Sequence, residues 1–256
     1  MSVAAFRRAA ILMFSLSIFS GTAKGQLEPG FCGEYVGSVN KDIEIGMSLE
    51  TDGHELRGDY FYKRYLKDIP VKGEYVSERD IVLHEYTAEG EMKGTFKLRF
   101  VEQDPEGPRG PLKSEVMRGT WISSDGSESY PVFLSMEHGS PSSCEPRYAV
   151  AGATSDERVE KNVQGFYFSV LKGDKQKVAD YVAFPLTFSL HKNSKTVYNR
   201  TAFLRYYDQI FTNKFVAAIA NGIPHHMFAN WQGIMIGNGV VWFDDEGKAR
   251  HFNNQD

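Results

Sequence analysis

Cys32 and Cys144 are the only two cysteines of the 256-residue chain, and their chemistry is the easiest to predict. In an oxidising compartment, two thiols form a disulfide by default. In the chain-entropy model, closing so long a loop stabilises a fold by roughly 4 to 5 kcal/mol. We therefore expect a Cys32–Cys144 disulfide, and buried free thiols are the alternative interpretation.

Other reactive residues do not form a motif of known chemistry. The sequence has no HExxH pair, no paired-cysteine zinc spacing and no GxSxG serine elbow. His225 and His226 are adjacent, so on a strand they would point to opposite faces and could not bind one metal ion together. The acidic turn Asp244–Glu246 lacks the regularly spaced oxygen ligands of a calcium loop. We therefore predict no metal site and no cofactor.

The first 25 residues have the order of a cleavable signal peptide. Arg7 and Arg8 precede an uncharged apolar stretch over residues 9–19, and small residues follow up to Gly25. This stretch is shorter than the roughly 20 residues that cross a bilayer, which favours cleavage over anchoring. We predict a periplasmic or secreted protein that is cut near Gly25 and has no membrane span in its mature form.

Charge and composition exclude some partners. Residues 1–25 contain three of the 29 Lys and Arg residues and no acid, so cleavage moves the formal net charge from −4 to −7. An acidic chain without a basic cluster is a poor partner for nucleic acid or anionic lipid. The hydrophobic fraction of 41% and the charged fraction of 24% are typical of a globular protein.

One five-residue pattern recurs in the first half: an apolar residue, a polar residue, glycine, a polar residue and an aromatic residue. It occurs at Phe31–Tyr35, Leu56–Tyr60, Val71–Tyr75, Met92–Phe96 and Met117–Trp121. Because strand side chains alternate between faces, the apolar residue, the glycine and the aromatic residue share one face. For residues 26–148 we predict about eight antiparallel strands in a meander or small barrel, with one longer loop around Asp104–Pro111. The inward glycines favour a packed interior, and a ligand-holding cup is the alternative.

Residues 139–152 are rich in Gly, Ser, Pro and Ala, which predicts a boundary before a second domain over residues 149–256. Apolar residues then recur every three or four positions, as in amphipathic helices. The residues with N-cap chemistry before these helices are Thr154, Asp174, Asn199 and Thr212. We expect the second helix to end before Pro185, a strand over Leu186–His191, and two or three antiparallel strands at the end of the chain.

The segment Glu157–Phe252 resembles the nuclear transport factor 2-like superfamily, also described as cystatin-like cone or SnoaL-like. Three stretches carry the resemblance: LKGDKQKVADYVAFPL, TAFLRYYDQIFT and QGIMIGNGVVWFDDEGK. The resemblance implies an α+β cone in which helices pack on a curved antiparallel sheet. It covers nearly all of the second half but fixes no activity, because this scaffold has catalytic and non-catalytic members.

Catalytic members of this superfamily use a carboxylate inside the cone as a general base, alone or with a histidine. The resemblance therefore implies three catalytic candidates, which are Asp180, His191 and Asp208. The candidates for the ligand-binding wall are Tyr181, Tyr206, His225 and Trp231. Asp180 and Asp208 fall beside apolar helix positions, where a role on the helix surface is more common than catalysis.

We expect an exported, non-catalytic binding or interaction module of the bacterial envelope, whose partner is a small apolar ligand or a protein. The alternative is an acid-base enzyme of the isomerase, dehydratase or hydrolase type that uses a carboxylate or histidine in the cone. The two differ in a structural feature. A solvent-facing carboxylate above a filled cone argues against the enzyme, whereas a buried carboxylate beside a histidine in an open pocket argues for it.

Overall fold

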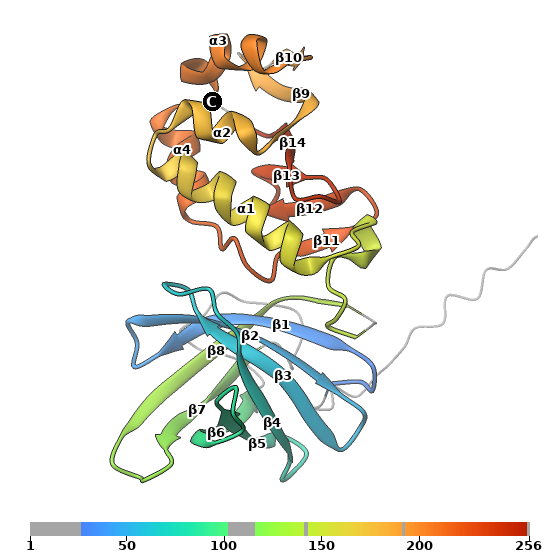
Figure 1. The fold of residues 1–256 in the computed structure, drawn as a ribbon. Coiled ribbons are helices and arrows are strands. Elements are labelled where there is room, and N and C mark those ends of the chain that lie inside the picture. The colour runs from blue at the N-terminus through green and yellow to red at the C-terminus, as the bar shows by residue number, and fades with distance from the viewer. Residues whose placement is uncertain (1–26, 102–115, 141–142, 191–192, 255–256) are drawn as a thin grey trace, which may run out of the picture.

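The computed structural model describes residues 27–101, 116–140, 143–190 and 193–254 (Figure 1). The predicted signal peptide, the predicted loop around Asp104–Pro111 and the candidate His191 lie outside the described residues. Figure 1 shows a β-barrel below and a region of helices and strands above, which we call the C-terminal region. Within the described residues, no helix is both long and apolar enough to cross a membrane.

Eight strands form the barrel, in agreement with the predicted number. They are β1 (Cys32–Val39), β2 (Ile43–Thr51), β3 (Glu55–Tyr62), β4 (Ile69–Tyr75), β5 (Asp80–Tyr86), β6 (Met92–Val101), β7 (Val116–Ser123) and β8 (Ser129–Ser140). Each strand pairs antiparallel with the next, and β8 pairs with β1. The first half is therefore a closed barrel, the more specific of the two predicted forms.

The recurring pattern places its large residues inside the barrel. Its buried members include Tyr35, Leu56, Tyr60, Val71, Phe96 and Met117. The glycines allow the strands to approach closely. A Cβ on Gly58 of β3 would collide with the carbonyl oxygen of Ser48 on β2. Inward glycines thus permit the strong curvature that closes a small barrel.

The C-terminal region combines four α-helices, a short 3-10 helix and a mixed six-stranded sheet. The helices are the 3-10 helix Ala149–Ala151, α1 (Asp156–Leu171), α2 (Lys175–Asp180), α3 (Arg200–Ile210) and α4 (Asn213–Ala220). The strands are β9 (Val182–Leu190), β10 (Asn193–Val197), β11 (Phe228–Asn230), β12 (Gly233–Ile236), β13 (Val241–Phe243) and β14 (Ala249–Phe252). Their order across the sheet is β10-β9-β14-β13-β12-β11.

Several details of the second half differ from the prediction, and one is the number of closing strands, which is four, β11 to β14, where two or three were expected. The sheet is mixed, because β14 pairs parallel with β9. Helices α3 and α4 lie between these strands in sequence and provide the crossover that parallel pairing needs. In addition, Pro185 was expected to lie between the second helix and a strand that begins at Leu186. In the structure the strand β9 begins at Val182, so Pro185 lies inside it.

Three of the four predicted N-caps are confirmed, and the first is wrong by one residue. The side chains of Asp174, Asn199 and Thr212 accept hydrogen bonds from backbone N–H groups at the starts of α2, α3 and α4. At α1 the cap is Ser155, whose hydroxyl accepts from the Arg158 N–H at 3.2 Å. Ser155 has the extended backbone of an N-cap, so the helix starts one residue later than Thr154 predicts.

Aromatic side chains fill the space between the helices and the sheet of the C-terminal region. The fully buried phenylalanines are Phe166, Phe188, Phe203, Phe243 and Phe252. Phe166 from α1 lies 5.5 Å, centroid to centroid, from Phe243 of β13, in an edge-to-face contact. This core is apolar and separate from the buried cluster of the barrel.

A disulfide joins Cys32 to Cys144, as predicted. It ties the first residue of β1 to the segment that follows β8 and leads to the C-terminal region. The Cys144 backbone N–H also donates to the Glu50 carboxylate on β2, at 2.9 Å. The start of the connecting segment is therefore fixed to the barrel.

Candidate functional site

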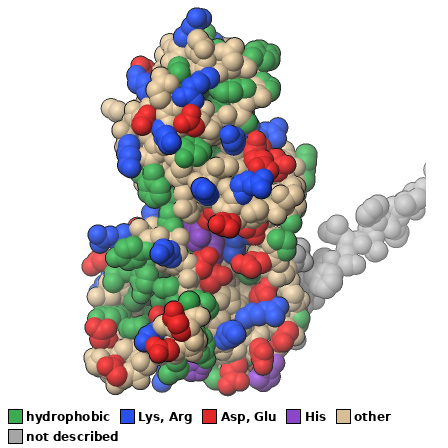
Figure 2. Space-filling view, viewed as in Figure 1, with side chains coloured by type: hydrophobic (Ala, Val, Ile, Leu, Met, Phe, Trp, Pro, Cys, Tyr) green, Lys and Arg blue, Asp and Glu red, His purple; other side chains and the backbone are tan. Residues whose placement is uncertain are grey.

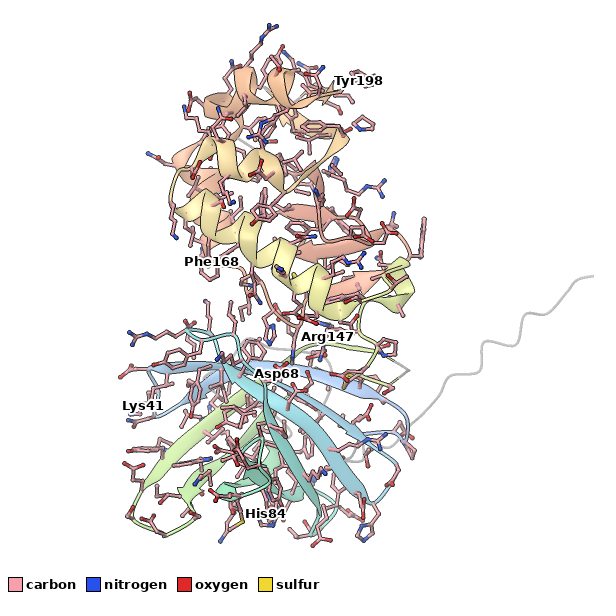
Figure 3. The ribbon with its side chains drawn as sticks, viewed as in Figure 1. Lys41, Asp68, His84, Arg147, Phe168 and Tyr198 are labelled. Atoms are coloured by element: carbon pink, nitrogen blue, oxygen red, sulfur yellow. A yellow bond between two sulfur atoms is a disulfide. The ribbon has the colours of Figure 1, made fainter. Side chains whose placement is uncertain are left out.

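The C-terminal region covers the outer face of β1, β2 and β3. Residues that point out of the barrel are consequently buried there, as are Glu34, Ser48 and Phe61. The loop with His225 and His226, between α4 and β11, lies against them. Figure 3 shows Asp68 and Arg147 at this junction, and Figure 2 shows histidine and acidic side chains gathered at the waist of the molecule.

The two histidines lie side by side and do not point to opposite faces. Their rings stack with centroids 4.3 Å apart and planes 28° apart. His226 has a left-handed backbone with φ of 49°, and neither residue lies in a strand. The premise that adjacent histidines in this chain must diverge is therefore wrong, because it assumed strand geometry. Phe61 contacts both rings edge-on.

Each ring nitrogen of His225 lies against a carboxylate. Nε2 is 2.7 Å from Oδ1 of Asp68, in the loop between β3 and β4. Nδ1 is hydrogen-bonded to Oε2 of Glu160 on α1. The other oxygen of Glu160 accepts from the Tyr148 hydroxyl, at 2.6 Å, and from the His226 backbone N–H, at 3.1 Å. His225 thus connects an acid of the barrel to an acid of the C-terminal region.

His226 is held mainly by the barrel. Its Nδ1 is 2.8 Å from the Ser48 hydroxyl, and its Nε2 is 3.0 Å from Asp68 Oδ1. Asp59 Oδ1 lies 3.4 Å from the same Nε2. This oxygen of Asp59 is buried and has no hydrogen-bond partner among the described residues. Both imidazoles therefore direct Nε2 toward Asp68, and the His226 Nε2 also lies near Asp59.

A buried ion pair supports this arrangement. The Ser48 hydroxyl donates to Glu34 Oε2 at 2.6 Å, and Arg147 forms an ion pair with Glu34 Oε1. The side chains of Glu34 and Arg147 are each 9% exposed. We use the name junction cluster for these residues: Glu34, Ser48, Asp59, Asp68, Arg147, Tyr148, Glu160, His225 and His226.

Burial and neighbouring charges separate the pKa values of the cluster. Burial favours the neutral form of His225, but hydrogen bonds to Asp68 and Glu160 outweigh it and raise the His225 pKa to about 9. Burial lowers the pKa of His226 to about 4. Burial and the nearby Asp68 charge raise the pKa of Asp59 to about 8. The pKa of Asp68 itself falls well below its usual value, because its hydrogen bonds to both histidines outweigh desolvation.

Ser48, His226 and Asp68 have the residue types of a nucleophile, a base and an orienting acid. The geometry argues against this chemistry, because Ser48 is fully buried. Its hydroxyl already donates to Glu34, so its proton does not point at His226. The cluster therefore lacks an accessible hydroxyl nucleophile at this position.

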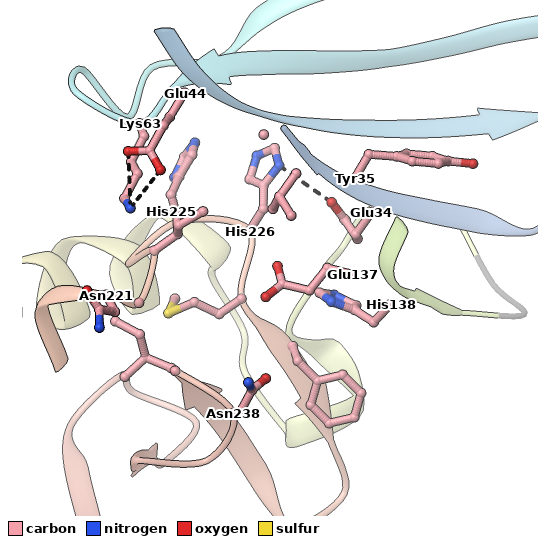
Figure 4. A pocket seen from close by; sticks show the side chains of 18 of the residues that line it. Glu34, Tyr35, Glu44, Lys63, Glu137, His138, Asn221, His225, His226 and Asn238 are labelled. Atoms are coloured by element: carbon pink, nitrogen blue, oxygen red, sulfur yellow. Dashed lines mark hydrogen bonds and ion pairs between the residues drawn. The ribbon is translucent and has the colours of Figure 1, made fainter. Parts of the chain in front are cut away.

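A cleft of about 760 Å³ lies beside the junction cluster, between the barrel and the C-terminal region. Its apolar wall includes Val36, Phe61, Phe133, Ile223, Met227, Phe228 and Ile236. Its polar groups include Glu34, Glu44, Lys63, Glu137, His138, Asn221, His225, His226 and Asn238 (Figure 4). Glu137 and His138 both reach the cleft because the register of β8 against β1 shifts opposite Glu34 and Tyr35.

The structure places the two helical carboxylate candidates at the surface. Asp180 pairs with Arg200 at 2.5 Å, and Asp208 pairs with Lys175 at 2.6 Å. Their side chains are 47% and 78% exposed. Neither has a recorded contact with a histidine of the described residues, and the two belong to separate ion pairs.

The predicted ligand-binding residues do not form one wall. Trp231 is 80% exposed at the β11–β12 turn. Tyr181 packs over Gly165 of α1, and Tyr206 lies near Phe188 and Lys195. Of the four, only His225 lies in the cleft and the junction cluster.

Sequence reasoning missed the acids of the junction cluster. Glu34 and Asp59 occupy polar positions of the recurring strand pattern, which normally face water. Glu160 lies one residue from the apolar face of α1. A weak signal was available in the pair His225-His226, because two adjacent histidines that end in a buried loop need polar partners.

Comparison with known proteins does not assign the chain to a family. No protein-family profile matches the sequence, and no curated protein matches it. A de novo designed fluorescence-activating β-barrel is similar over 44% of this chain and 96% of its own, with 15% identity and a TM-score of 0.28. A similarity of that quality supports no conclusion about fold or function.

Proposed function

We propose that this protein is an exported binding protein that holds a small molecule in the cleft between the barrel and the C-terminal region. The observation that carries the proposal is the cleft itself, whose volume of about 760 Å³ falls within the range of small-molecule sites. Its apolar walls with a few convergent polar groups are typical of such sites. Export rests on the predicted signal peptide, and the Cys32–Cys144 disulfide fits an oxidising compartment.

The lining defines the chemistry of the ligand. Phe133, Met227 and Phe228 offer apolar surface, while Figure 4 shows the Glu137 carboxylate directed into the cleft. Lys63 is 3.4 Å from Glu44, which partly neutralises that end. A ligand with an apolar body and a hydrogen-bond donor or cationic group facing Glu137 fits this arrangement. The core of the C-terminal region is filled with buried aromatic side chains.

Blocking the cleft tests the proposal. Ser135 points outward from β8 into the cleft, so Ser135→Trp fills it. Ser129 points outward from the same strand, is exposed and does not line the cleft, so Ser129→Trp is a matched control. Titration with the neutral apolar dye Nile red is expected to show saturable binding that Ser135→Trp weakens by about tenfold or more, which corresponds to at least about 1.4 kcal/mol.

The control variant is expected to bind the dye like the unmodified protein. Equal binding by both variants would show that the dye lies elsewhere, and an absence of saturable binding would contradict the proposal. Native mass spectrometry of the protein from its own host then identifies the bound compound as an adduct that Ser135→Trp loses.

The second candidate is an acid-base enzyme, and the buried contact of His225 with Asp68 and Glu160 is the observation that favours it. Buried histidine-carboxylate pairs with shifted pKa values are a feature of many active sites. A substrate would reach His225 from the cleft. Turnover that survives Asp180→Asn and Asp208→Asn but not His225→Gln would support this candidate over binding alone.

We also propose that the C-terminal region is a cone of the nuclear transport factor 2-like type. Two opening helices, a β-hairpin, two further helices and a run of closing strands support this proposal, as does the helix-covered aromatic core. An experimental structure of the C-terminal region that superposes on this fold class with the same strand order is the test.

A further inference from the structure

Three side chains of the junction cluster, Asp68, His225 and His226, place one ligand atom each within 4.8 Å of one another, and Asp59 lies beside them. Asp59 lies on β3, Asp68 in the β3–β4 loop, and His225 and His226 in the α4–β11 loop. Asp68 Oδ1 is 2.7 Å from the His225 Nε2 and 3.0 Å from the His226 Nε2. Asp59 Oδ1 is 3.4 Å from the His226 Nε2. Ligand atoms around a tetrahedral zinc ion lie roughly 3.3 Å apart, so these spacings need little adjustment to accept one.

The outer contacts of both histidines hold Nδ1, so Nε2 of each ring is the atom that faces Asp68 and would face a metal ion. Nδ1 of His225 is hydrogen-bonded to Glu160, and Nδ1 of His226 is hydrogen-bonded to Ser48. A ligating histidine nearly always has such a partner on its second nitrogen, which fixes the tautomer and the ring orientation. Both rings thus have the outer partners that metal-bound histidines require.

Asp59 provides independent support. In the part of the chain that the structure describes, its buried Oδ1 lacks a hydrogen-bond partner, although buried polar atoms nearly always have one. The side chain is 18% exposed and directed at His226. A cation bound by Asp68, His225 and His226 would give this oxygen a partner once the Asp59 side chain shifts toward it. Two carboxylates and two neutral imidazoles would also balance a divalent ion.

We propose that Asp68, His225 and His226 bind one divalent transition-metal ion, Zn²⁺ by preference, that a shift of the Asp59 side chain completes the site as a fourth ligand, and that the ion clamps the barrel to the C-terminal region. Nitrogen and oxygen ligands in this number suit zinc, and four protein ligands make a closed, structural site. Asp68, whose side chain is 45% exposed, lies on the entry side. The inference does not rest on the proposed cleft ligand.

The test begins with the full mature protein after treatment with a chelator. Titration with Zn²⁺ in competition with a chromophoric chelator is expected to show one ion per chain with micromolar or tighter affinity. Co²⁺ at the same site is expected to give the intense visible absorption of tetrahedral cobalt. Weaker binding, a different stoichiometry, or only the faint spectrum of octahedral cobalt would overturn the proposal.

Variants locate the site. His226→Gln and Asp68→Asn are expected to weaken Zn²⁺ binding by more than roughly 100-fold, and Glu160→Gln, which removes an outer partner, by roughly 10- to 100-fold. His54→Gln on the exposed β2–β3 turn and Asp180→Asn on the surface are matched controls that should not change affinity. Unchanged binding in both ligand variants would overturn the proposal even if the unmodified protein binds zinc.

Circular dichroism of each variant separates loss of a ligand from loss of the fold. If both ligand variants unfold, the stoichiometry and cobalt spectrum of the unmodified protein still decide the question. Nile red titration of the same samples reports on the cleft separately. Zinc binding without dye binding would support the metal site and contradict the proposed function. Dye binding without zinc binding would support the proposed function and contradict the metal site.

Discussion

The core of the C-terminal region and its junction with the barrel are both buried, but their chemistry differs sharply. The core is lined by phenylalanines such as Phe166, Phe203 and Phe252. The junction buries His225, His226 and several carboxylates in one hydrogen-bonded network. Buried charges lower stability unless they are paired. A chain that keeps them is therefore less stable than one with an apolar junction, and the buried charges serve specificity or function. The comparison therefore directs functional interest away from the core of the C-terminal region and toward the junction.

The largest expected effect concerns the bond that fixes the connecting segment. Reduction of the Cys32–Cys144 disulfide is expected to lower the free energy of unfolding of the barrel by roughly 4 to 5 kcal/mol, because it releases the unfolded chain from a long closed loop. Guanidinium denaturation with and without a phosphine reductant measures it, and Cys32→Ser with Cys144→Ser is the genetic equivalent. A loss below about 1 kcal/mol would mean that the junction holds the segment without the bond.

The aromatic core is the next target. Phe203→Ala is expected to lower the free energy of unfolding by about 4 kcal/mol, since Phe203 is fully buried and leaves a cavity. Phe168→Ala, at a position 44% exposed on α1, should change it by about 0.5 kcal/mol or less. Urea denaturation of both variants makes the comparison. A small loss at Phe203 would indicate a loosely packed core in the C-terminal region and would make that core a candidate ligand site.

The buried ion pair tests the junction in the same way. Arg147→Met is expected to lower the free energy of unfolding by about 3 kcal/mol, because it leaves the buried Glu34 carboxylate without its cation. The Ser48 hydroxyl still donates to Glu34, which limits the loss. In the double variant with Glu34→Gln, much of the stability should return, and the double-mutant cycle gives the coupling energy. A double variant as unstable as the single one would argue against an unpaired charge as the cause.

Most of the architecture could be predicted from the sequence, because local patterns dominate it. The glycine-aromatic repeat predicts the barrel strands, and Asp174, Asn199 and Thr212 mark helix starts. Local sequence patterns do not predict which strands pair when the strands are far apart in sequence. The parallel pairing of β14 with β9 is such a case. The nuclear transport factor 2-like assignment and the domain limits at residues 26–148 and 149–256 stay predictions.

The candidate site could not be predicted, because it forms between segments far apart in sequence. Asp68 and His225 are separated by 157 positions, and nothing in either segment indicates the other. Glu34 and Asp59 lie on the barrel face that a single domain would expose to water. That face is buried only because the C-terminal region packs on it. The alternation of polar residues therefore predicts the strands correctly, but it wrongly predicts that their polar face is exposed to water.

A smaller effect is expected from pH at the cleft. Burial lowers the pKa of His138 to about 4, so the folded protein favours the neutral imidazole. Above the unfolded-state pKa of about 6.5, His138 is neutral in both states and does not oppose folding. As the pH falls from 6.5 toward 4, the unfolded chain binds a proton that the folded protein does not, so the free energy of unfolding decreases. His138→Gln should therefore lose less stability than the unmodified protein between pH 7 and pH 5, measured by urea denaturation at each pH. His54→Gln, at an exposed position, is the control and should lose as much stability as the unmodified protein. An equal loss of stability in His138→Gln and the unmodified protein would contradict the prediction.

The smallest effects should come from the surface carboxylates that the sequence offers as catalytic candidates. Asp180 and Asp208 each pair with an exposed cation, and such pairs contribute about 1 kcal/mol or less. Asp180→Asn and Asp208→Asn are therefore expected to change the free energy of unfolding by no more than that and to leave Nile red binding unchanged. Thermal and urea denaturation with the same dye titration measure both properties. A loss of ligand binding in either variant would move the functional site from the junction to the helical surface, because no contact of these two carboxylates reaches the cleft in the part of the chain that the structure describes.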